Sequence, residues 1–274
     1  MDFREIGKLV SEDRLSLEYL WKKRGNTLCP SCHSSEFYYH QRWRLRCRGC
    51  KRDYWPLQGT HFSHLRISPS QWLSLVKLFE LSTSARKASQ EVHLSYKTTL
   101  KAYDILRSAI VEELATTDNI LKGELEADEA YFGGKRKGKR GRGAGGKTIV
   151  FGILERGGKV SVSIVQDVSA ESLMTETVKR VRRGSIVYTD KWRGYDSLMF
   201  CGYKHLNIDH QYKFKQGKVY INGIEGFWAF AKERLIKHHG ISRQKFLYYI
   251  KEMEWRYNNR GKDLFEALVD LMLH

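Results

Sequence analysis

The sequence contains no run of 18 or more consecutive apolar residues, so it offers no candidate for a membrane-spanning helix. Its first residues, MDFREIGKLV, lack the basic region followed by an apolar region that marks a secretion signal. No internal repeat divides the chain. Neither a membrane-spanning nor a secreted protein is supported, and we expect this chain in the cytoplasm.

What the sequence has in excess is positive charge. Its 274 residues include 48 Lys and Arg against 31 Asp and Glu, which gives a formal net charge of +17. This excess favours a polyanionic partner, with nucleic acid ahead of an anionic membrane surface. The hydrophobic share of 41% can fill a core, so we expect a folded, globular protein.

Composition divides the chain into three zones, which we interpret as domains: residues 1–58, 59–118 and 119–274. The middle zone shows the periodicity of amphipathic helices, first over residues 69–82 and then over 84–114. Within the second segment we predict a short helix, a tight turn at residues 93–95 and a longer helix with Lys97 and Lys101 on its exposed side. This order resembles a DNA-binding helix-turn-helix, although other helical hairpins share it.

The third zone changes to the periodicity of strands. Three strands are expected first, with a hairpin turn at Gly157 and Gly158, then a helix, a fourth strand and two closing helices. The strands are predicted at residues 124–134, 147–158, 159–168 and 184–190, and the helices at 169–183, 221–238 and 242–258. Three antiparallel strands, helix, strand, helix is the order of the ribonuclease H-like fold, a mixed sheet with flanking helices.

The first zone contains a zinc-ribbon pattern. Cys29 and Cys32 form one CxxC pair, Cys47 and Cys50 form a second, and fourteen residues separate the pairs. Two residues between thiolates let both sulfurs of a pair reach one tetrahedral ion, so we predict a closed, structural Zn²⁺ site. The alternative is a pair of redox-active CxxC motifs. Cys201 has no such partner in the sequence.

Acidic residues far apart in the sequence predict a second metal site. Asp128 lies in the first strand of the third zone and Asp190 ends the fourth; these strands are neighbours in a ribonuclease H-like sheet. Two adjacent carboxylates repel unless a cation lies between them, and oxygen ligands suit Mg²⁺ or Mn²⁺. Glu225, in the helix that follows, is the third acid, and Asn222 and Lys232 share its helical face.

The same helix contains Trp228, which we expect to pack in the core rather than to stack on a base. Glu126 shares the strand face of Asp128 and ranks below it as a site residue.

Four motifs carry a resemblance to a known family: ADEAYFGG, VYTDKWRGY, INGIEGFWAFAKERL and YNNR. Together with the zinc-ribbon pattern they resemble the insertion-sequence DDE transposases of the ISXO type over nearly the whole chain. The resemblance implies a catalytic domain that cuts at the ends of its own mobile element and joins them to target DNA with divalent metal. It makes Asp128 and Asp190 the first two acids. The family often has an asparagine at the position of Asn222 as third member, whereas spacing favours Glu225.

Glycine and basic residues make up the segment 133–147 almost entirely. Such a segment cannot bury a core, and it is either a solvated loop or a clamp that orders on DNA. We favour the clamp because the segment closely follows Asp128. Its basic members are Lys135, Arg136, Lys137, Lys139, Arg140, Arg142 and Lys147.

These patterns together predict a DNA transposase. In this interpretation the zinc ribbon and the helix-turn-helix bind element ends, and a DDE domain at 119–274 performs two-metal phosphoryl transfer. The partner is double-stranded DNA rather than a membrane, the protein is nucleoid-associated when bound, and handling two ends calls for a homodimer or larger synaptic assembly. The alternatives are a structure-specific metal-dependent nuclease and a zinc-ribbon DNA-binding regulator derived from a transposase.

Overall fold

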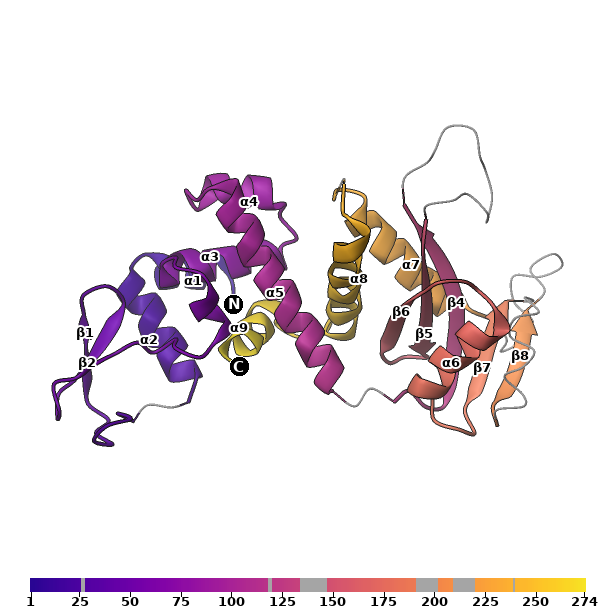
Figure 1. Cartoon of the computed structure of the whole chain (residues 1–274), viewed down its shortest axis with the longest axis horizontal. Helices are drawn as coiled ribbons and strands as arrows, with labels where there is room; N and C mark the ends of the chain where they lie inside the picture. The colour runs from indigo at the N-terminus through magenta and orange to yellow at the C-terminus, as the bar shows by residue number, and fades with distance from the viewer. Residues whose placement is uncertain (26–27, 118–119, 134–146, 191–201, 209–219, 239) are drawn as a thin grey trace. The chain divides into compact units, whose positions relative to one another are not determined.

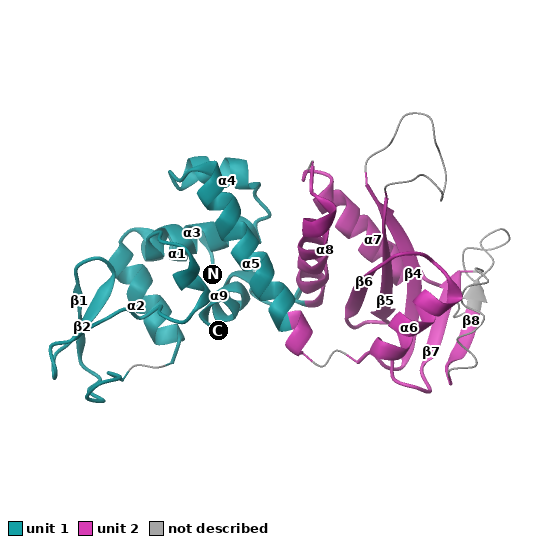
Figure 2. Ribbon diagram, viewed as in Figure 1, with its two compact units in different colours: residues 1–113, 259–274 teal, residues 114–258 magenta. Residues whose placement is uncertain are grey.

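Two compact units make up the chain in the computed structural model, and Figure 2 shows each in its own colour. Unit 1 comprises Met1–Glu113 and Asn259–His274, and unit 2 comprises Leu114–Asn258. The division of the chain into three domains at residues 58 and 118 stays a prediction. The structure describes residues 1–25, 28–117, 120–133, 147–190, 202–208, 220–238 and 240–274.

Unit 1 is helical and carries a small antiparallel sheet (Figure 1). Its sheet has the order β1-β2-β3, from β1 (Phe37–His40), β2 (Arg44–Cys47) and β3 (Asp53–Tyr54). Its helices are α1 (Phe3–Val10), α2 (Asp13–Lys23), the 3-10 helix η1 (His61–His64), α3 (Pro69–Glu80), α4 (Ala85–Glu91), α5 (Tyr96–Thr116) and α9 (Leu264–Leu273). Both α1 and α2 precede the cysteines, where the sequence predicts only a ribbon.

Local chemistry explains where the helices of the middle zone begin and end. Ser68 and Gln71 cap α3 reciprocally, each side chain accepting a hydrogen bond from the other residue's backbone N–H. His93 follows α4 in the left-handed conformation, with φ of 51°, and turns the chain into α5. The predicted short helix, turn and long helix are therefore present. Their use in reading DNA stays a prediction.

Unit 2 is built on a five-stranded mixed sheet with the order β6-β5-β4-β7-β8. The central strand β4 (Glu124–Phe132) pairs antiparallel with β5 (Thr148–Glu155), which pairs antiparallel with β6 (Val160–Val165). On its other side β4 pairs parallel with β7 (Ile186–Asp190), and β7 pairs parallel with β8 (Lys204–Ile208). The first four strands confirm the prediction, including the contact between the strands of the two aspartates. The sequence did not predict β8.

Helices cover both faces of this sheet. Helix α6 (Ala170–Arg180) packs on the face that carries Leu125 and Ala127 of β4. Helices α7 (Asn222–Leu235) and α8 (Arg243–Asn258) pack on the opposite face, over Ala130 and Phe132. Because side chains alternate along a strand, Glu126 and Asp128 also belong to the α7 face. The core of unit 2 thus has two layers, and the candidate site lies on the α7 side.

The last helix of unit 2 covers the edge strand of the sheet. Asn258, part of the YNNR motif, accepts a hydrogen bond from Val160 N–H at 2.8 Å and donates one to Val160 O at 2.9 Å. Glu254 accepts another from Val162 N–H at 3.1 Å. These bonds satisfy backbone groups that an uncovered edge would expose. Part of the YNNR motif therefore has a structural role.

The prediction that two helices close the chain is wrong, because α9 follows them. Its apolar residues recur at helical spacing and are buried in unit 1: Phe265, Leu268, Val269 and Met272. Among the described helices, none is long and apolar enough to cross a membrane.

Candidate active site

Asp128 and Asp190 lie on neighbouring parallel strands. The last paired residues of β4 and β7 are Glu126 and Tyr188, and each aspartate follows two residues later on its strand. Both aspartates therefore point to the α7 face. Their charges interact, since the Asp190 carboxylate is one of the groups that raise the pKa of Asp128. Residues 62 positions apart in the sequence thus form an acidic pair at one place on the sheet.

The environment of Asp128 disfavours its negative charge. Burial is the main cause that raises the pKa of Asp128 to about 7, and the charges of Glu129 and Asp190 add to it. The indole of Trp228 opposes this effect by donating a hydrogen bond from Nε1 to Asp128 Oδ2 at 3.1 Å. A cation close to Asp128 would offset these effects, because an opposite charge favours the ionised form.

Asp190 has a buried oxygen that lacks a partner. Within the described residues, no hydrogen-bond donor reaches Asp190 Oδ1. A buried acceptor without a donor is uncommon in folded proteins and calls for an explanation. A divalent cation shared with Asp128 would satisfy this oxygen and remove the repulsion between the two carboxylates. The residues present therefore fit a Mg²⁺ or Mn²⁺ ion.

Helix α7 presents the other predicted site residues. Asn222, Glu225 and Lys232 are exposed on one side of α7. The other side is buried and apolar, formed by Ile224, Phe227, Trp228, Ala231 and Leu235. The expected sharing of one helical face is observed, and Trp228 packs in the core as expected.

The structure does not bring the third acid onto the aspartate pair. Among the described residues, the only group of three or more His, Cys, Asp or Glu with ligand atoms all within 4.8 Å of one another is the four cysteines. Glu225 therefore does not share such a cluster with Asp128 and Asp190. The choice between Glu225 and Asn222 stays a prediction.

Glu126, which ranked low in the sequence, ties α7 to the sheet. Its Oε2 accepts a hydrogen bond from the backbone N–H of Ile224 at 2.9 Å, and α7 has no cap from its own N-terminal side chain. The Gly223 backbone lies so close that an added Cβ would come within 2.8 Å of Oε2. A strand carboxylate thus caps this helix from outside.

Arg156 holds Glu126 in place. Its guanidinium lies 3.0 Å from Glu126 Oε1 and 2.7 Å from Glu124 Oε2, and it donates to Tyr220 O. It also lies between two rings, 3.7 Å from the Tyr188 centroid and 3.9 Å from the Tyr220 centroid. Nothing in the local sequence pattern distinguishes Arg156 from a surface arginine at a strand end.

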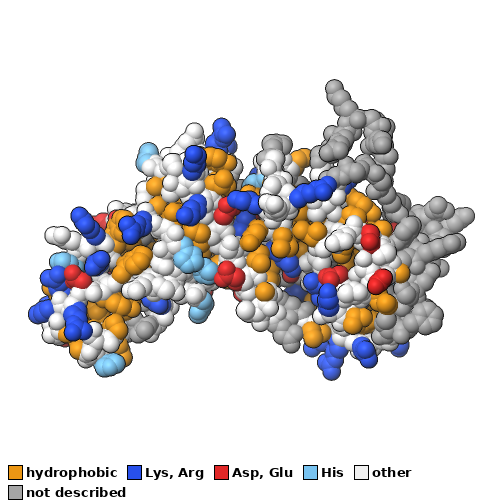
Figure 3. All heavy atoms as spheres, in the orientation of Figure 1, with side chains coloured by type: hydrophobic (Ala, Val, Ile, Leu, Met, Phe, Trp, Pro, Cys, Tyr) orange, Lys and Arg blue, Asp and Glu red, His pale blue; other side chains and the backbone are white. Residues whose placement is uncertain are grey.

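The predicted DNA-binding residues are only partly described. Lys97 and Lys101 are exposed on α5, as predicted. Figure 3 shows further basic side chains gathered over the β1–β2 end of unit 1 and around α4. Lys147 is half-buried just before β5. The rest of the basic segment lies outside the described residues: Lys135, Arg136, Lys137, Lys139, Arg140 and Arg142.

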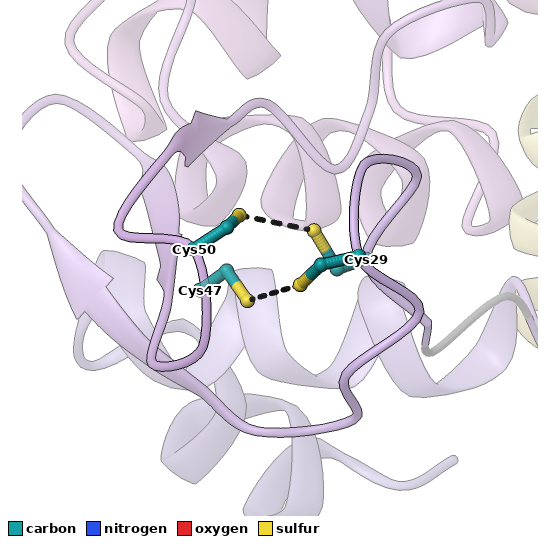
Figure 4. Close-up of side chains that lie close together, drawn as sticks. Cys29, Cys47 and Cys50 are labelled. Carbon is teal, nitrogen blue, oxygen red and sulfur yellow. Dashed lines mark hydrogen bonds between the residues drawn. The ribbon is translucent and has the colours of Figure 1, made fainter.

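The four cysteines form a second site, in unit 1. Their sulfurs all lie within 4.8 Å of one another, and Figure 4 shows the labelled members Cys29, Cys47 and Cys50 turned toward a common centre. The Cys29–Cys50 and Cys32–Cys47 sulfur distances are 3.7 and 3.5 Å. A tetrahedral zinc with Zn–S bonds of about 2.3 Å would set its sulfurs roughly 3.8 Å apart. The cluster therefore fits one zinc ion.

Both cysteine pairs have the same backbone shape. His33 N–H donates to Cys29 O and Lys51 N–H donates to Cys47 O, and both donors have φ near 60°. Backbone N–H groups of Cys50 and Gly49 point at the Cys47 sulfur and help lower the pKa of that thiol to about 6. Gly49 also leaves room for the cluster, since a Cβ there would lie 3.3 Å from the Cys32 sulfur.

The comparisons with known protein sequences all point to transposable elements. A model of the ISXO2-like transposase domain family matches residues 120–258. An uncharacterized transposase-like protein of Haemophilus influenzae is 42% identical over 101 residues, which span 37% of this chain and 82% of that protein. An uncharacterized protein in transposable element ISH50 of Halobacterium salinarum is 26% identical, with 98% of this chain and 99% of that protein covered.

Among solved structures, the HTLV-2 integrase catalytic core domain in complex with magnesium is similar to this chain at 13% identity with a TM-score of 0.36. The match covers 58% of this chain and all of that domain. Similarity this low adds nothing to the fold described above.

Proposed function

Because the chain belongs to the ISXO2-like transposase domain family, we propose that it is the DNA transposase of an insertion sequence, which cleaves element ends and joins them to target DNA. The observation that supports this most directly is the acidic pair of Asp128 and Asp190, one of which has a buried oxygen without a hydrogen-bond donor in the described structure. Such a pair suits metal-assisted phosphoryl transfer.

In this proposal each site residue has its own role. Asp128 and Asp190 hold the divalent ion, Mg²⁺ or Mn²⁺, and Glu225 supplies the third ligand. Asn222, on the first turn of α7, positions a ligand, a water or a phosphate, and Lys232 holds the DNA backbone. Bound divalent ions would activate a water or a 3′-hydroxyl and stabilise the leaving oxygen at the phosphate.

The remaining parts bind and orient DNA. Cys29, Cys32, Cys47 and Cys50 hold a structural zinc ion, and basic side chains of the ribbon, of α5 and of the segment 133–147 contact phosphates. Two element ends have to be handled together, so we propose a homodimer or a larger assembly on double-stranded DNA.

The experiment is a cleavage and strand-transfer assay with the purified full chain, DNA from the ends of its element, and Mg²⁺. Asp128→Ala and Asp190→Ala should each lower the cleavage rate by more than about a hundredfold while circular dichroism shows an intact fold. Cleavage at the wild-type rate in either variant would contradict the proposal. Cleavage without joining would point to a nuclease, and binding without cleavage to a regulator.

The third ligand is decided in the same assay by Glu225→Gln and Asn222→Ala. We expect Glu225→Gln to lose activity as the aspartate variants do, because an amide is a weaker ligand for Mg²⁺ than a carboxylate. Full activity of Glu225→Gln together with loss in Asn222→Ala would assign the position to Asn222 instead.

A further inference from the structure

Trp228 makes a contact that core packing alone does not require. Its ring is buried on the α7 side of the sheet, where it packs against Phe227 and Phe132 with ring centroids 5.0 and 6.1 Å away. An indole buried in this way keeps its N–H satisfied by a nearby acceptor. Here the acceptor is Asp128 Oδ2, at 3.1 Å. The buried side of α7 is therefore hydrogen-bonded directly to one member of the acidic pair.

The sheet is shaped to admit this ring. Gly152 on β5 lies directly opposite Asp128 on β4. A Cβ at Gly152 would lie 2.6 and 2.7 Å from two indole carbons of Trp228 and 3.1 Å from Ile224 Cδ1. Carbon atoms do not approach this closely, so a side chain at position 152 would displace the indole. The glycine in the middle of this strand is explained by the close approach of the ring.

A second bond fixes the same helix on the same strand. Glu126 accepts from Ile224 N–H, and Asp128 accepts from Trp228 Nε1–H. Two residues of a strand advance roughly 6.6 Å and one helical turn advances about 5.4 Å, so the two bonds run side by side. With two points of attachment, α7 has little freedom to slide or rotate over β4.

We propose that Trp228 is a positioning residue for Asp128: its indole N–H holds one carboxylate oxygen so that the other faces the cation site. The inference rests on the proposed function, because it gives Asp128 the role of metal ligand. Without this donor the Asp128 carboxylate would be free to rotate about its Cβ–Cγ bond and would present a less favourable geometry to the ion. Outer hydrogen-bond partners of metal ligands change metal affinity or activity by about 10- to 100-fold.

The test compares variants that separate the N–H donor from the ring. Trp228→Phe keeps an aromatic ring on Gly152 and removes the donor. Gly152→Ala keeps the indole and displaces it. Trp255→Phe is the matched control, since Trp255 is a buried tryptophan of α8 in the same unit. The first readout is Mn²⁺ binding to the zinc-loaded full chain, measured by electron paramagnetic resonance without DNA.

We expect Trp228→Phe and Gly152→Ala to weaken Mn²⁺ binding by about tenfold or more, and Trp255→Phe to leave it unchanged. In the DNA cleavage assay the Trp228→Phe variant should need a higher Mg²⁺ concentration and show a lower kcat, with KM for DNA within about twofold of the wild type. A purely structural role would lower stability without this selective change.

Unchanged Mn²⁺ affinity in a folded Trp228→Phe variant would overturn the inference. If that variant fails to fold, benzothienylalanine at position 228 keeps the bicyclic ring and replaces only the N–H by sulfur, and the same criterion applies to it. The proposed function has its own control, Asp128→Ala. Equal Mn²⁺ binding by wild type and Asp128→Ala, or none by the wild type, would overturn the metal site itself and the role of Trp228 with it.

Discussion

Asp128 is a carboxyl group in surroundings that disfavour its charge. Burial and two neighbouring acids raise its pKa to about 7, compared with 3.8 for an unperturbed aspartate. The ionised form of Asp128 therefore lowers the stability of the folded protein when no cation is near it.

The first prediction concerns the pH dependence of stability. Above pH 7 Asp128 is ionised in both the folded and unfolded states, so the folded state bears the full cost; below pH 3.8 it is protonated in both and bears none. Asp128→Asn should therefore stabilise the metal-free protein at pH 8, by about 4 kcal/mol at most, and have little effect at pH 4. Thermal unfolding without Mg²⁺ and without chelator measures this.

Asp167→Asn is the control of opposite sign. Hydrogen bonds from Ser169 and Ser172 lower the pKa of Asp167 to about 2, so its contribution to stability is present above pH 3.8 and lost as the pH falls toward 2. This substitution should lower the melting temperature at pH 8. An Asp128→Asn variant that is no more stable than the wild type at pH 8 would contradict the assignment of a disfavoured charge.

At the scale of elements, helix α7 depends on the strand beneath it. Its N-terminal N–H groups lack a cap from the preceding residue, and the cap comes from Glu126 on β4, which Arg156 neutralises. The exposed side of α7 is thus placed by an ion pair that itself takes no part in the proposed chemistry.

The second prediction tests this ion pair. Arg156→Ala leaves Glu126 buried, with its side chain 1% exposed, and without its cation. We expect the loss to cost about 3–5 kcal/mol in the free energy of unfolding of unit 2. Lys179→Ala removes an ion pair whose lysine is 61% exposed and should cost less than about 1 kcal/mol. Urea unfolding compares the two variants. A loss of less than about 1 kcal/mol in Arg156→Ala, as expected for the exposed pair, would contradict the prediction.

The third prediction concerns the cysteine cluster. We expect one zinc ion per chain by elemental analysis, and its removal by a chelator should open the ribbon of β1, β2 and β3 to proteolysis while the sheet of unit 2 persists. Cys29→Ser should lose the metal, and Cys201→Ser should keep it. Disulfides and no zinc in the purified protein would favour the redox alternative.

For the whole molecule, the net charge of +17 concerns binding rather than folding. The segment 133–147 connects the C-terminal end of β4 to β5. Strand β7 runs parallel to β4 and ends at Asp190, so Asp190 is at the same end of the sheet as this segment, while Asp128 lies in the middle of β4. Arg182 and Arg183 precede β7 and are therefore at the other end of the sheet. Substitutions of basic residues at the two ends of the sheet can therefore distinguish a local DNA clamp from a general effect of the net charge.

The fourth prediction uses this difference. Six Gln substitutions within the segment should lower the slope of log affinity against log salt by up to about 5, because each phosphate contact contributes roughly 0.9. Substituting Gln for Lys179, Arg182 and Arg183 should change the slope by less than about 1. A similar change in both variants, measured by fluorescence anisotropy on the same DNA, would contradict the clamp. The six residues are Lys135, Arg136, Lys137, Lys139, Arg140 and Arg142.

The sequence by itself determined those features of the protein that depend on a local pattern or on the spacing of a few residues. The two CxxC pairs predicted the cysteine cluster, because a knuckle is formed by a few consecutive residues. Periodicity predicted the strands β4 to β7 and the exposed side of α7 that carries Asn222, Glu225 and Lys232. Membership of the transposase family was also readable, since its motifs are short and lie in order along the chain.

Only the tertiary structure decided which distant residues support the site. Trp228 donates to Asp128, and Gly152 makes room for the indole ring. Glu126 caps α7, and Arg156 holds Glu126 in place. All of these contacts join a strand to a helix about 100 positions away or join facing strands. No periodicity reports such contacts, because they arise from the register of α7 on the sheet. The position of α9 in unit 1 was hidden for the same reason: its partners lie at the other end of the chain.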